Sequence, residues 1–374
     1  MSFRQFKMTK LMETSSKEVY KPLILSASDV DSINTLKKLA TDKTLLVHDE
    51  IKSQVGDLIR LRNPSRKYSS VELDEAVLDF FGDQPLSDFG NWVYYPWRHC
   101  LVHMLPEDEF VTVRTVRNKH VITEDEQKQL ANKKIGVIGL SVGQSVALTL
   151  ALERGCGELR LADFDRLELS NLNRIRTGVH NLGIKKSVVA AREIAEIDPY
   201  LNVVLYNEGV NDDNIHDFLT QDGKLDLLIE ECDSLEVKIK SRIKAKDLGI
   251  PVLMDTSDRG MIDIERFDVE PDRPILHGML EKFGDESSLV EKIPTQNAEI
   301  LMALLDFNKL SIGAQQSIQE IGKSITSWPQ LASSVILGGG ACGYYSRMIL
   351  LGKGILSGRY YVDLERIVNY SHGS

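Results

Sequence analysis

Residues 134–165 read KIGVIGLSVGQSVALTLALERGCGELRLADFD, and this stretch decides the fold. Ile135–Ile138 is a short apolar run of the kind that forms a buried parallel strand. Gly139 follows where the backbone must turn, and apolar residues at helical spacing come next. A second apolar run, Glu158–Ala162, ends at Asp163. The order predicts a nucleotide-binding βαβ unit, with phosphates at the helix N-terminus and the acid at a ribose.

The glycine pattern of this turn departs from the dinucleotide-binding fingerprint Gly-x-Gly-x-x-Gly. In the window Gly139–Gln144 only the first glycine is in register, and Gly143 stands at another position. Taken alone, the stretch fits a structural α/β crossover nearly as well as a nucleotide site. The segments around it favour the nucleotide site.

Four further segments complete a specific order. They are RTVRN at 114–118, DFDRLELSNLNRIR at 163–176, GIKKSVVAAREIAEIDP at 183–199 and LDLLIEECDS at 225–234. This succession, from about Arg114 to the C-terminus, resembles the E1-like adenylyltransferases: the ubiquitin-activating enzymes and the bacterial activators of sulfur-carrier proteins of ThiF, MoeB and HesA type. The resemblance implies an enzyme that uses ATP to adenylate a carboxylate and releases pyrophosphate.

The resemblance also implies where the nucleotide binds. Asp163 would hold the ribose hydroxyls, and Asn171 and Arg174 of the Ser-Asn-Leu-x-Arg motif would contact the triphosphate. Lys186 would touch the phosphates, with Lys185 as a neighbouring competitor. The residues expected at the ATP are Gly139, Ser141, Gly143, Asp163, Asp165, Asn171, Arg174 and Lys186.

The catalytic residues that the resemblance implies are Arg117, Arg174, Lys186 and Asp233. Asp233 would hold Mg²⁺, and Arg117, from the Arg-x-x-Arg pattern that begins at Arg114, would reach the terminal phosphates. In many members of the family the partner subunit donates the arginine that corresponds to Arg174. A homodimer is therefore expected.

The chemistry of adenylation agrees with this set of residues. A carboxylate is already an anion and a nucleophile, so its attack on the α-phosphate of ATP needs no strong base. The difficulty is electrostatic, because a negative group must approach a negative triphosphate. Cations, backbone N–H groups and a metal ion around the phosphates reduce this repulsion. Arginines, a lysine, a helix N-terminus and one metal-binding carboxylate match that need.

Each residue also has a purely structural interpretation. Asp163 can cap the turn that follows it, and Asp233 can cap a helix that begins near Leu235. Arg174 or Lys186 alone would be an ordinary surface residue. Their occurrence together in family order favours the nucleotide roles.

The chain departs from the family pattern at several positions. Residues other than the usual glycines, glutamine and asparagine stand at Ser141, Val142, Gln144, Ile175 and Ser234. The changed glycine loop leaves open a non-catalytic E1-like scaffold or peptide-binding subunit. An NAD(P)-dependent oxidoreductase on the same βαβ unit is the other alternative. It gives no role to Asn171, Arg174, Lys186 and Asp233 as a set.

The four cysteines, at 100, 156, 232 and 342, form no Cys-x-x-Cys pair, so no zinc is expected. No cysteine lies between Cys232 and Cys342, which predicts adenylation without the thioester step of a ubiquitin-type E1. Cys232 ends an apolar run and is expected to be a small buried hydrophobe. The spacings indicate reduced thiols.

Composition is typical of a soluble cytoplasmic enzyme. The chain has 374 residues, of which 42% are hydrophobic and 27% charged, and no apolar segment is long enough to span a membrane. The net charge of −10 argues against general nucleic-acid binding. We expect a mobile tail at 1–16, an accessory region at 17–110 that could clamp a peptide or substrate, and an E1-like domain at 111–374.

From residue 134 onward, apolar runs alternate with helical patterns, which predicts an α/β fold with a doubly wound, mostly parallel, Rossmann-like sheet. The expected strands are 135–138, 158–162, 203–206, 225–230, 252–255, 262–267 and 359–362, and the expected helices are 144–153, 186–196, 213–219, 235–248, 297–307, 311–325 and 328–351. Ligands bind at the carboxyl ends of such strands. Asp255, Asp258 and Arg259 therefore either shape a substrate pocket or form a plain turn.

The identity of the carboxylate stays open. Candidates are a peptide, a ubiquitin-like protein tail, a modified tRNA base or a small acid. The layout also resembles the E1-like module that some bacterial proteins join to a nitroreductase-like domain.

Overall fold

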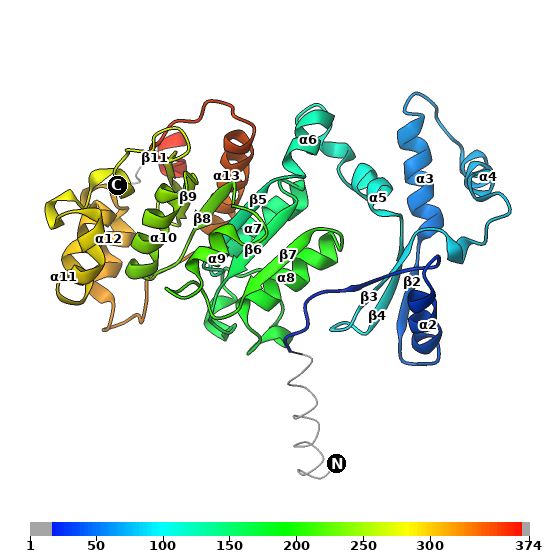
Figure 1. Cartoon of the computed structure of the whole chain (residues 1–374), viewed down its shortest axis with the longest axis horizontal. Coiled ribbons are helices and arrows are strands. Elements are labelled where there is room, and N and C mark those ends of the chain that lie inside the picture. The colour runs from blue at the N-terminus through cyan, green and yellow to red at the C-terminus, as the bar shows by residue number, and fades with distance from the viewer. Residues whose placement is uncertain (1–16, 369–374) are drawn as a thin grey trace, which may run out of the picture. The chain divides into compact units, whose positions relative to one another are not determined.

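The computed structural model describes residues 17–368, so the expected tail at residues 1–16 lies outside the described residues. The chain divides into two compact units (Figure 1). One contains residues 17–124 and Ala195–Tyr200, and the other contains Asp125–Ile194 and the residues from Leu201 onward. The predicted α/β class with a large, mostly parallel sheet is confirmed.

The second unit is built around a sheet of strand order β11-β10-β9-β8-β5-β6-β7. The strands are β5 (Lys134–Ile138), β6 (Glu158–Ala162), β7 (Asn202–Tyr206), β8 (Leu227–Glu230), β9 (Val252–Thr256), β10 (Met261–Glu265) and β11 (Gly358–Tyr361). Strands β9, β8, β5, β6 and β7 run parallel to one another, and β10 and β11 are each antiparallel to their neighbours. The direction of winding reverses beside β5, whose last residue Ile138 pairs with both Ala162 and Glu230.

Helices cover both faces of this sheet. The helices of this unit are α6 (Glu124–Leu130), α7 (Gly143–Glu153), α8 (Lys186–Ile197), α9 (Ile215–Thr220), α10 (Leu235–Asp247), α11 (Leu289–Leu305), α12 (Ile312–Glu320), α13 (Ala332–Leu350) and α14 (Leu364–Ile367). Short 3₁₀ turns lie at Leu169–Asn171, Val179–Asn181, Ile275–Gly278, Glu281–Phe283, Glu286–Ser288 and Phe307–Lys309. Right-handed crossovers place α7 and α8 on one face and α9 and α10 on the other.

The interior strands are apolar for the reason that the sequence indicates. Ile135 and Val137 on one face of β5 are buried, and so is Ile138 on the other, because helices cover the strands on both sides. Gly136 lies in the same strand where a side chain would not fit: a Cβ there would come within 2.5 Å of Leu225.

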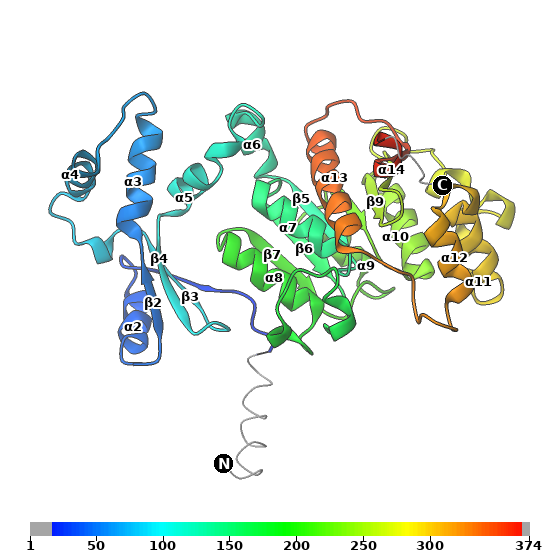
Figure 2. The same cartoon turned by 180° about the vertical axis from the view of Figure 1, so that it is seen from behind.

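Helix α13 lies close to α7 and to β9 (Figure 2). Three of its glycines make this possible. A Cβ at Gly338 would lie 1.8 Å from Asp255 Oδ2, one at Gly339 would lie 2.3 Å from Ser145 Oγ, and one at Gly343 would lie 2.7 Å from Thr149 Cγ2. The glycine run of this helix is therefore a packing feature.

Three helices differ from the sequence expectation, and one of them, α12, ends at Glu320 instead of the expected 325. Helix α11 begins at Leu289, before the expected 297, and continues through Pro294 with a non-helical residue at Gln296. The proline hid this beginning, because proline normally ends a helical pattern. Helix α13 begins at Ala332, so Trp328 belongs to the preceding loop.

The first unit contains a sheet of order β1-β3-β4-β2. Its strands are β1 (Leu23–Ser26), β2 (Leu46–Asp49), β3 (Asn91–Tyr95) and β4 (Cys100–Met104), and its helices are α2 (Val30–Leu39), α3 (Ile51–Arg62), α4 (Ser70–Phe81) and α5 (Glu107–Arg114), with 3₁₀ turns at Leu86–Asp88 and Val116–Asn118. Strands β3 and β4 pair as an antiparallel hairpin, and Ser69 caps α4 with Glu72 in a capping box. Strand β1 had no clear signal in the sequence.

No helix within residues 17–368 has both the length and the apolar character that crossing a membrane requires.

The turn after β5 brings Gly139 against the end of β8. Its φ is +85°, and a Cβ there would lie 2.8 Å from the Cys232 nitrogen and the Glu231 carbonyl. Gly183 has a similar φ of +81°, but no described atom would lie within 4 Å of its Cβ.

These two glycines form a matched pair for a stability test. Gly183→Ala should lower the free energy of unfolding by about 1–2 kcal/mol, the cost of a left-handed backbone with a side chain. Gly139→Ala should lose about 1–3 kcal/mol more, because its methyl group also clashes with β8. Denaturant titration of both variants measures the difference. Equal losses would show that the close approach to β8 is not a constraint.

Candidate functional site

The residues predicted at the nucleotide gather at the carboxyl ends of β5, β6 and β8 in the second unit. Gly139 directly follows β5, Asp163 directly follows β6, and Asp233 is the third residue after β8. This edge lies where the winding direction reverses, which is where open α/β sheets bind ligands.

Asp163 holds the turn that follows β5. Its Oδ2 accepts from the Leu140 amide at 2.7 Å, and its Oδ1 accepts from the Asp165 amide at 2.8 Å. Burial raises the pKa of this carboxyl, and the two amides and nearby Lys186 act in the opposite direction. Asp163 thus links the ends of β5 and β6, and its role at a ribose stays a prediction.

Helix α7 begins directly after the glycine turn 139–142, so its N-terminus lies at the same edge of the sheet. Val142 is its N-cap and offers no capping side chain. The Ser145 amide donates to the Val142 carbonyl, and the Gly143 and Gln144 amides before it are the ones an anion would contact. Gly143 is required here, since a Cβ would lie 2.7 Å from Val137.

Arg174 lies beside the glycine turn of its own chain. Its Nε donates to Ser141 Oγ at 3.0 Å, and its Nη1 donates to Asn173 Oδ1 at 2.9 Å. Partial burial lowers the pKa of Arg174, and attraction to Asp233 opposes this effect. The structure therefore brings Arg174, Ser141 and Asp233 together in one chain, and a homodimer stays a prediction.

Gln144 holds the segment 174–176, called here the arginine segment, by hydrogen bonds. Its Oε1 accepts from the Arg176 amide at 3.0 Å, and its Nε2 donates to Glu193 Oε2 at 2.9 Å. The Gln144 side chain is 2% exposed. Two of the residues that replace family glycines, Ser141 and Gln144, thus contact the arginine segment directly.

Asn171 stabilises the turn that precedes Arg174. Its Oδ1 accepts from the Glu168 amide at 2.9 Å, and the side chain is buried. This contact shapes the turn Leu169–Asn171, and the predicted contact of Asn171 with phosphate is not tested by it.

Lys186 lies at the start of α8 and is 7% exposed. Its Nζ donates to Asp165 Oδ2 at 2.8 Å, and the Asp165 side chain is about half exposed at 51%. Lys185 has a different partner, since its Nζ donates to the Asn207 carbonyl and to Glu208. Lys186 is therefore the lysine that is held beside the predicted nucleotide edge, by its bond to Asp165, and Lys185 is held elsewhere.

Asp233 is exposed and is not the cap of α10. Ser234 fills that position, where its Oγ accepts from the Val237 amide at 3.3 Å. Residues 17–368 hold no cluster of three or more His, Cys, Asp or Glu side chains that could form an all-protein metal site. One exposed carboxylate fits the way in which Mg²⁺ is held together with substrate phosphates.

The two N-terminal arginines belong to the first unit. Arg114 ends α5 and donates to Asp198 Oδ2 at 3.0 Å. Arg117 lies in the 3₁₀ turn Val116–Asn118. Its predicted role at the terminal phosphates stays a prediction.

The cysteines are free and poorly suited to be nucleophiles. Burial raises the pKa of Cys156 to about 12, and burial with nearby Glu230 raises that of Cys232 well above its usual value. Cys232 packs against the hydrophobic core but is not fully buried as the sequence suggested. It is partly exposed, and its Sγ donates to Glu230 Oε1 at 2.9 Å.

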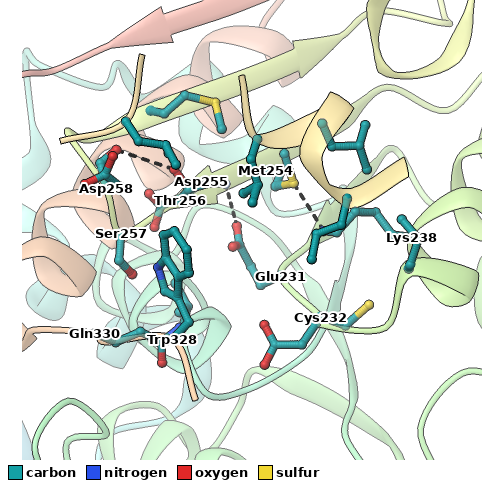
Figure 3. Close-up of a pocket in the computed structure, with 18 of the residues that line it drawn as sticks. Glu231, Cys232, Lys238, Met254, Asp255, Thr256, Ser257, Asp258, Trp328 and Gln330 are labelled. Carbon is teal, nitrogen blue, oxygen red and sulfur yellow. Dashed lines mark hydrogen bonds between the residues drawn. The ribbon is translucent and has the colours of Figure 1, made fainter. Parts of the chain in front are cut away.

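A cavity of about 470 Å³ opens beside this edge (Figure 3). Its lining includes Val142, Glu231 and Asp233, apolar side chains of α11 and α12, and Trp328 of the loop before α13. Polar and charged side chains, among them those of residues 255–258 at the end of β9 and in the turn after it, complete the wall. The sequence indicated helices in this region but gave no sign of a cavity, because its wall joins segments far apart in the chain.

The predicted substrate residues divide between two places. Asp255 and Asp258 line the cavity. Arg259 does not, since its Nε donates to Asp363 Oδ2 at 2.7 Å and its Nη1 donates to the Lys309 carbonyl at 2.8 Å. Asp258 accepts from the amide and the hydroxyl of Ser311.

Asp255 is a buried acid without a hydrogen-bond partner at either oxygen among the described residues. It is 4% exposed, its amide donates to Glu231 Oε1 at 2.8 Å, and Gly338 of α13 covers its carboxyl. Burial raises the pKa of Asp255 to about 7, and burial together with Asp255 raises that of Glu231. Ionisation of Asp255 therefore raises the free energy of the folded state.

Asp255→Asn should stabilise the protein. The unfolded carboxyl titrates near pH 4, so the free energy of unfolding of the wild type should fall between about pH 4 and pH 7, where only the folded state keeps the proton. The variant lacks the Asp255 part of this decline, while buried Glu231 keeps its own, and it should gain roughly 1–4 kcal/mol above pH 7 and little below pH 4. Asp258→Asn, which disturbs a bonded carboxylate, should instead lose about 1–3 kcal/mol. A destabilised Asp255→Asn at pH 8 would show that this acid has a stabilising partner.

Gln144→Met should release the arginine segment without unfolding the domain. We expect hydrogen exchange of the Arg176 amide to accelerate by at least about tenfold, because its acceptor is lost. Thr149→Val on the same helix removes a hydrogen bond to the Ser145 carbonyl and has no contact with the arginine segment, so exchange at Arg176 should not change. Equal protection in all three proteins would mean that Gln144 does not hold the segment.

Comparison with known proteins places part of this chain in a family. A model of the ThiF family matches residues 114–293. The uncharacterized protein MT1398 of Mycobacterium tuberculosis is 41% identical over 343 residues, which are 92% of this chain and 45% of that protein. The tRNA threonylcarbamoyladenosine dehydratase 2 of Saccharomyces cerevisiae is 26% identical over 148 residues, 39% of this chain and 33% of that protein.

Among solved structures, the E. coli tRNA N6-threonylcarbamoyladenosine dehydratase TcdA has a TM-score of 0.45 and 18% identity, over 65% of this chain and 95% of that one. The chain spans less than half the length of the two curated relatives named above. The segment that matches the family model includes the glycine turn, the Ser-Asn-Leu-Asn-Arg motif, Lys186 and Asp233. Residues 114–293 therefore match the ThiF family, in agreement with the E1-like family predicted from the sequence.

Proposed function

We propose that this protein binds Mg-ATP and adenylates a carboxylate. A carboxylate oxygen would attack the α-phosphorus, the bond from that phosphorus to the bridging oxygen of the β-phosphate would break, and pyrophosphate would leave. No proton needs to be moved in this step. The observation that carries the proposal is the gathering of Arg174, Lys186, the α7 N-terminus and exposed Asp233 at one edge of a ThiF-family domain.

The cationic groups are already held in place. Ser141 orients the guanidinium of Arg174, and Asp165 orients the ammonium of Lys186. Groups fixed before the reaction need little reorganisation when negative charge develops between the phosphates, and this is the main source of electrostatic catalysis. Mg²⁺, held by Asp233, would neutralise phosphate charge in the same region.

The changed glycine loop is the best argument for a non-catalytic scaffold, and the structure weakens it. Ser141 and Gln144 each bond to the arginine segment. Their replacement of glycine is thus compatible with a working site. An NAD(P)-dependent oxidoreductase would use Gly139 and Asp163, but it would leave Arg174, Lys186 and Asp233 without a role.

The oligomeric state, the cellular location and the role of the first unit are proposals as well. We propose a homodimer, a cytoplasmic location, and a first unit that binds part of a peptide or protein substrate. The contact of Arg174 with Ser141 occurs within one chain, so a dimer is not needed to bring this arginine to the glycine turn.

Nucleotide binding tests the proposal without a known substrate. Mg-ATP should bind far more tightly than NAD in calorimetry. Arg174→Ala should weaken ATP binding about 10–100-fold, the usual range for a charged hydrogen bond, and Asp233→Asn should abolish the gain in ATP affinity on adding Mg²⁺. Arg166→Ala is the matched control, because this exposed arginine contacts the Gly183 carbonyl and not the glycine turn. Tighter binding of NAD than of ATP would contradict adenylation.

A further inference from the structure

We propose that the cavity beside Asp233 holds the acyl part of the carboxylate substrate, and that this part is an apolar chain or ring without a second charge. The inference rests on the proposed adenylation, and it names the class of substrate for the same site: an apolar monocarboxylate.

The cavity is continuous with the predicted nucleotide edge. Val142 of the glycine turn and Asp233 both line it. The Ser-Asn-Leu-Asn-Arg motif contacts its wall as well, because Asn173 Nδ2 donates to the carbonyl of Gln330, another lining residue, at 2.6 Å. A carboxylate at the α-phosphate would therefore have the rest of its molecule in this cavity.

The wall of the cavity selects apolar groups. Helix α11 contributes Leu301, Met302 and Leu305, helix α12 contributes Ile318, and the loop before α13 contributes Trp328 (Figure 3). Burying one leucine-sized group against such a wall contributes about 1.5–3 kcal/mol. A volume of about 470 Å³ is enough for a small ligand.

The basic side chains in the wall already have acidic partners. Lys238 Nζ donates to Glu230 at 2.7 Å, Arg359 pairs with Asp263 at 2.7 Å, and Lys309 pairs with Asp306 at 2.7 Å. Each basic residue of the lining is therefore already paired, and none is left to neutralise a second negative charge on the ligand.

The acidic side chains supply no positive charge for a second carboxylate either. Glu231 and Asp255, whose pKa burial raises, line the cavity together with Asp233 and Asp258. A dicarboxylate whose first carboxylate lies at the α-phosphate would carry its second anion into the apolar part of the cavity while losing its hydration, and such a transfer is costly. A Gly-Gly tail has no side chains that could pack against the apolar wall.

Direct binding tests the inference independently of catalysis. Hexanoate and adipate have the same chain length and differ by one carboxylate. Measured by ligand-observed NMR, with and without a non-hydrolysable ATP analogue, hexanoate should bind at least about tenfold more tightly than adipate or glycylglycine. In the presence of ATP, hexanoate should also support more pyrophosphate exchange than either.

Two variants assign the binding to the cavity. Leu301→Glu places a charge in its wall at a side chain that is 44% exposed, and it should abolish hexanoate binding with little loss of stability. Ile312→Glu changes an exposed apolar residue of α12 that does not line the cavity, and it should bind hexanoate like the wild type.

The outcomes separate the two proposals. Binding of hexanoate without any nucleotide-dependent exchange would contradict adenylation and support the cavity assignment. ATP binding as predicted above, together with equal or tighter binding of adipate or glycylglycine, would overturn the substrate class. So would the absence of hexanoate binding in both conditions, or binding that survives Leu301→Glu.

Discussion

The contact of Gly139 with the end of β8 is the constraint on which the site depends. Only glycine fits there, because its φ is positive and its Cα faces the backbone of Glu231 and Cys232. Asp163 then ties the same turn to the end of β6 through two backbone amides. Three strand ends are thereby fixed against one another, and the α7 N-terminus, the arginine segment and Asp233 take their positions from this junction.

Most of the second unit was predictable because its signals are local. Buried parallel strands are short apolar runs, and their bounds agree with the structure within a few residues. The failures have physical causes. Pro294 hid the beginning of α11, and residues 328–331, Trp-Pro-Gln-Leu, precede α13 instead of forming its expected first turn. Strand β1 is four residues long and exposed at two of them, so it lacks a clear alternation.

The candidate site was predictable as a set of residues, but the sequence did not show what each one contacts. The motif order located Arg174, Lys186 and Asp233, and neither the pairing of Arg259 with Asp363 nor that of Lys185 with Glu208 could be read from it. Such partners come from segments that only the fold brings together. Gln144 shows the same limit, since it read as a departure from a glycine pattern and proved to be a hydrogen-bonding anchor.

The glycines of α13 have a consequence for the order of folding. Glycine within a helix costs about 0.5–1 kcal/mol relative to alanine, so this segment should form a weak helix in isolation. Its stability comes from close docking on α7 and β9, which lie far earlier in the chain. We therefore expect α13 to be among the last elements to become ordered. Until it docks, Asp255 stays hydrated, and its burial completes the unit only at the end of folding.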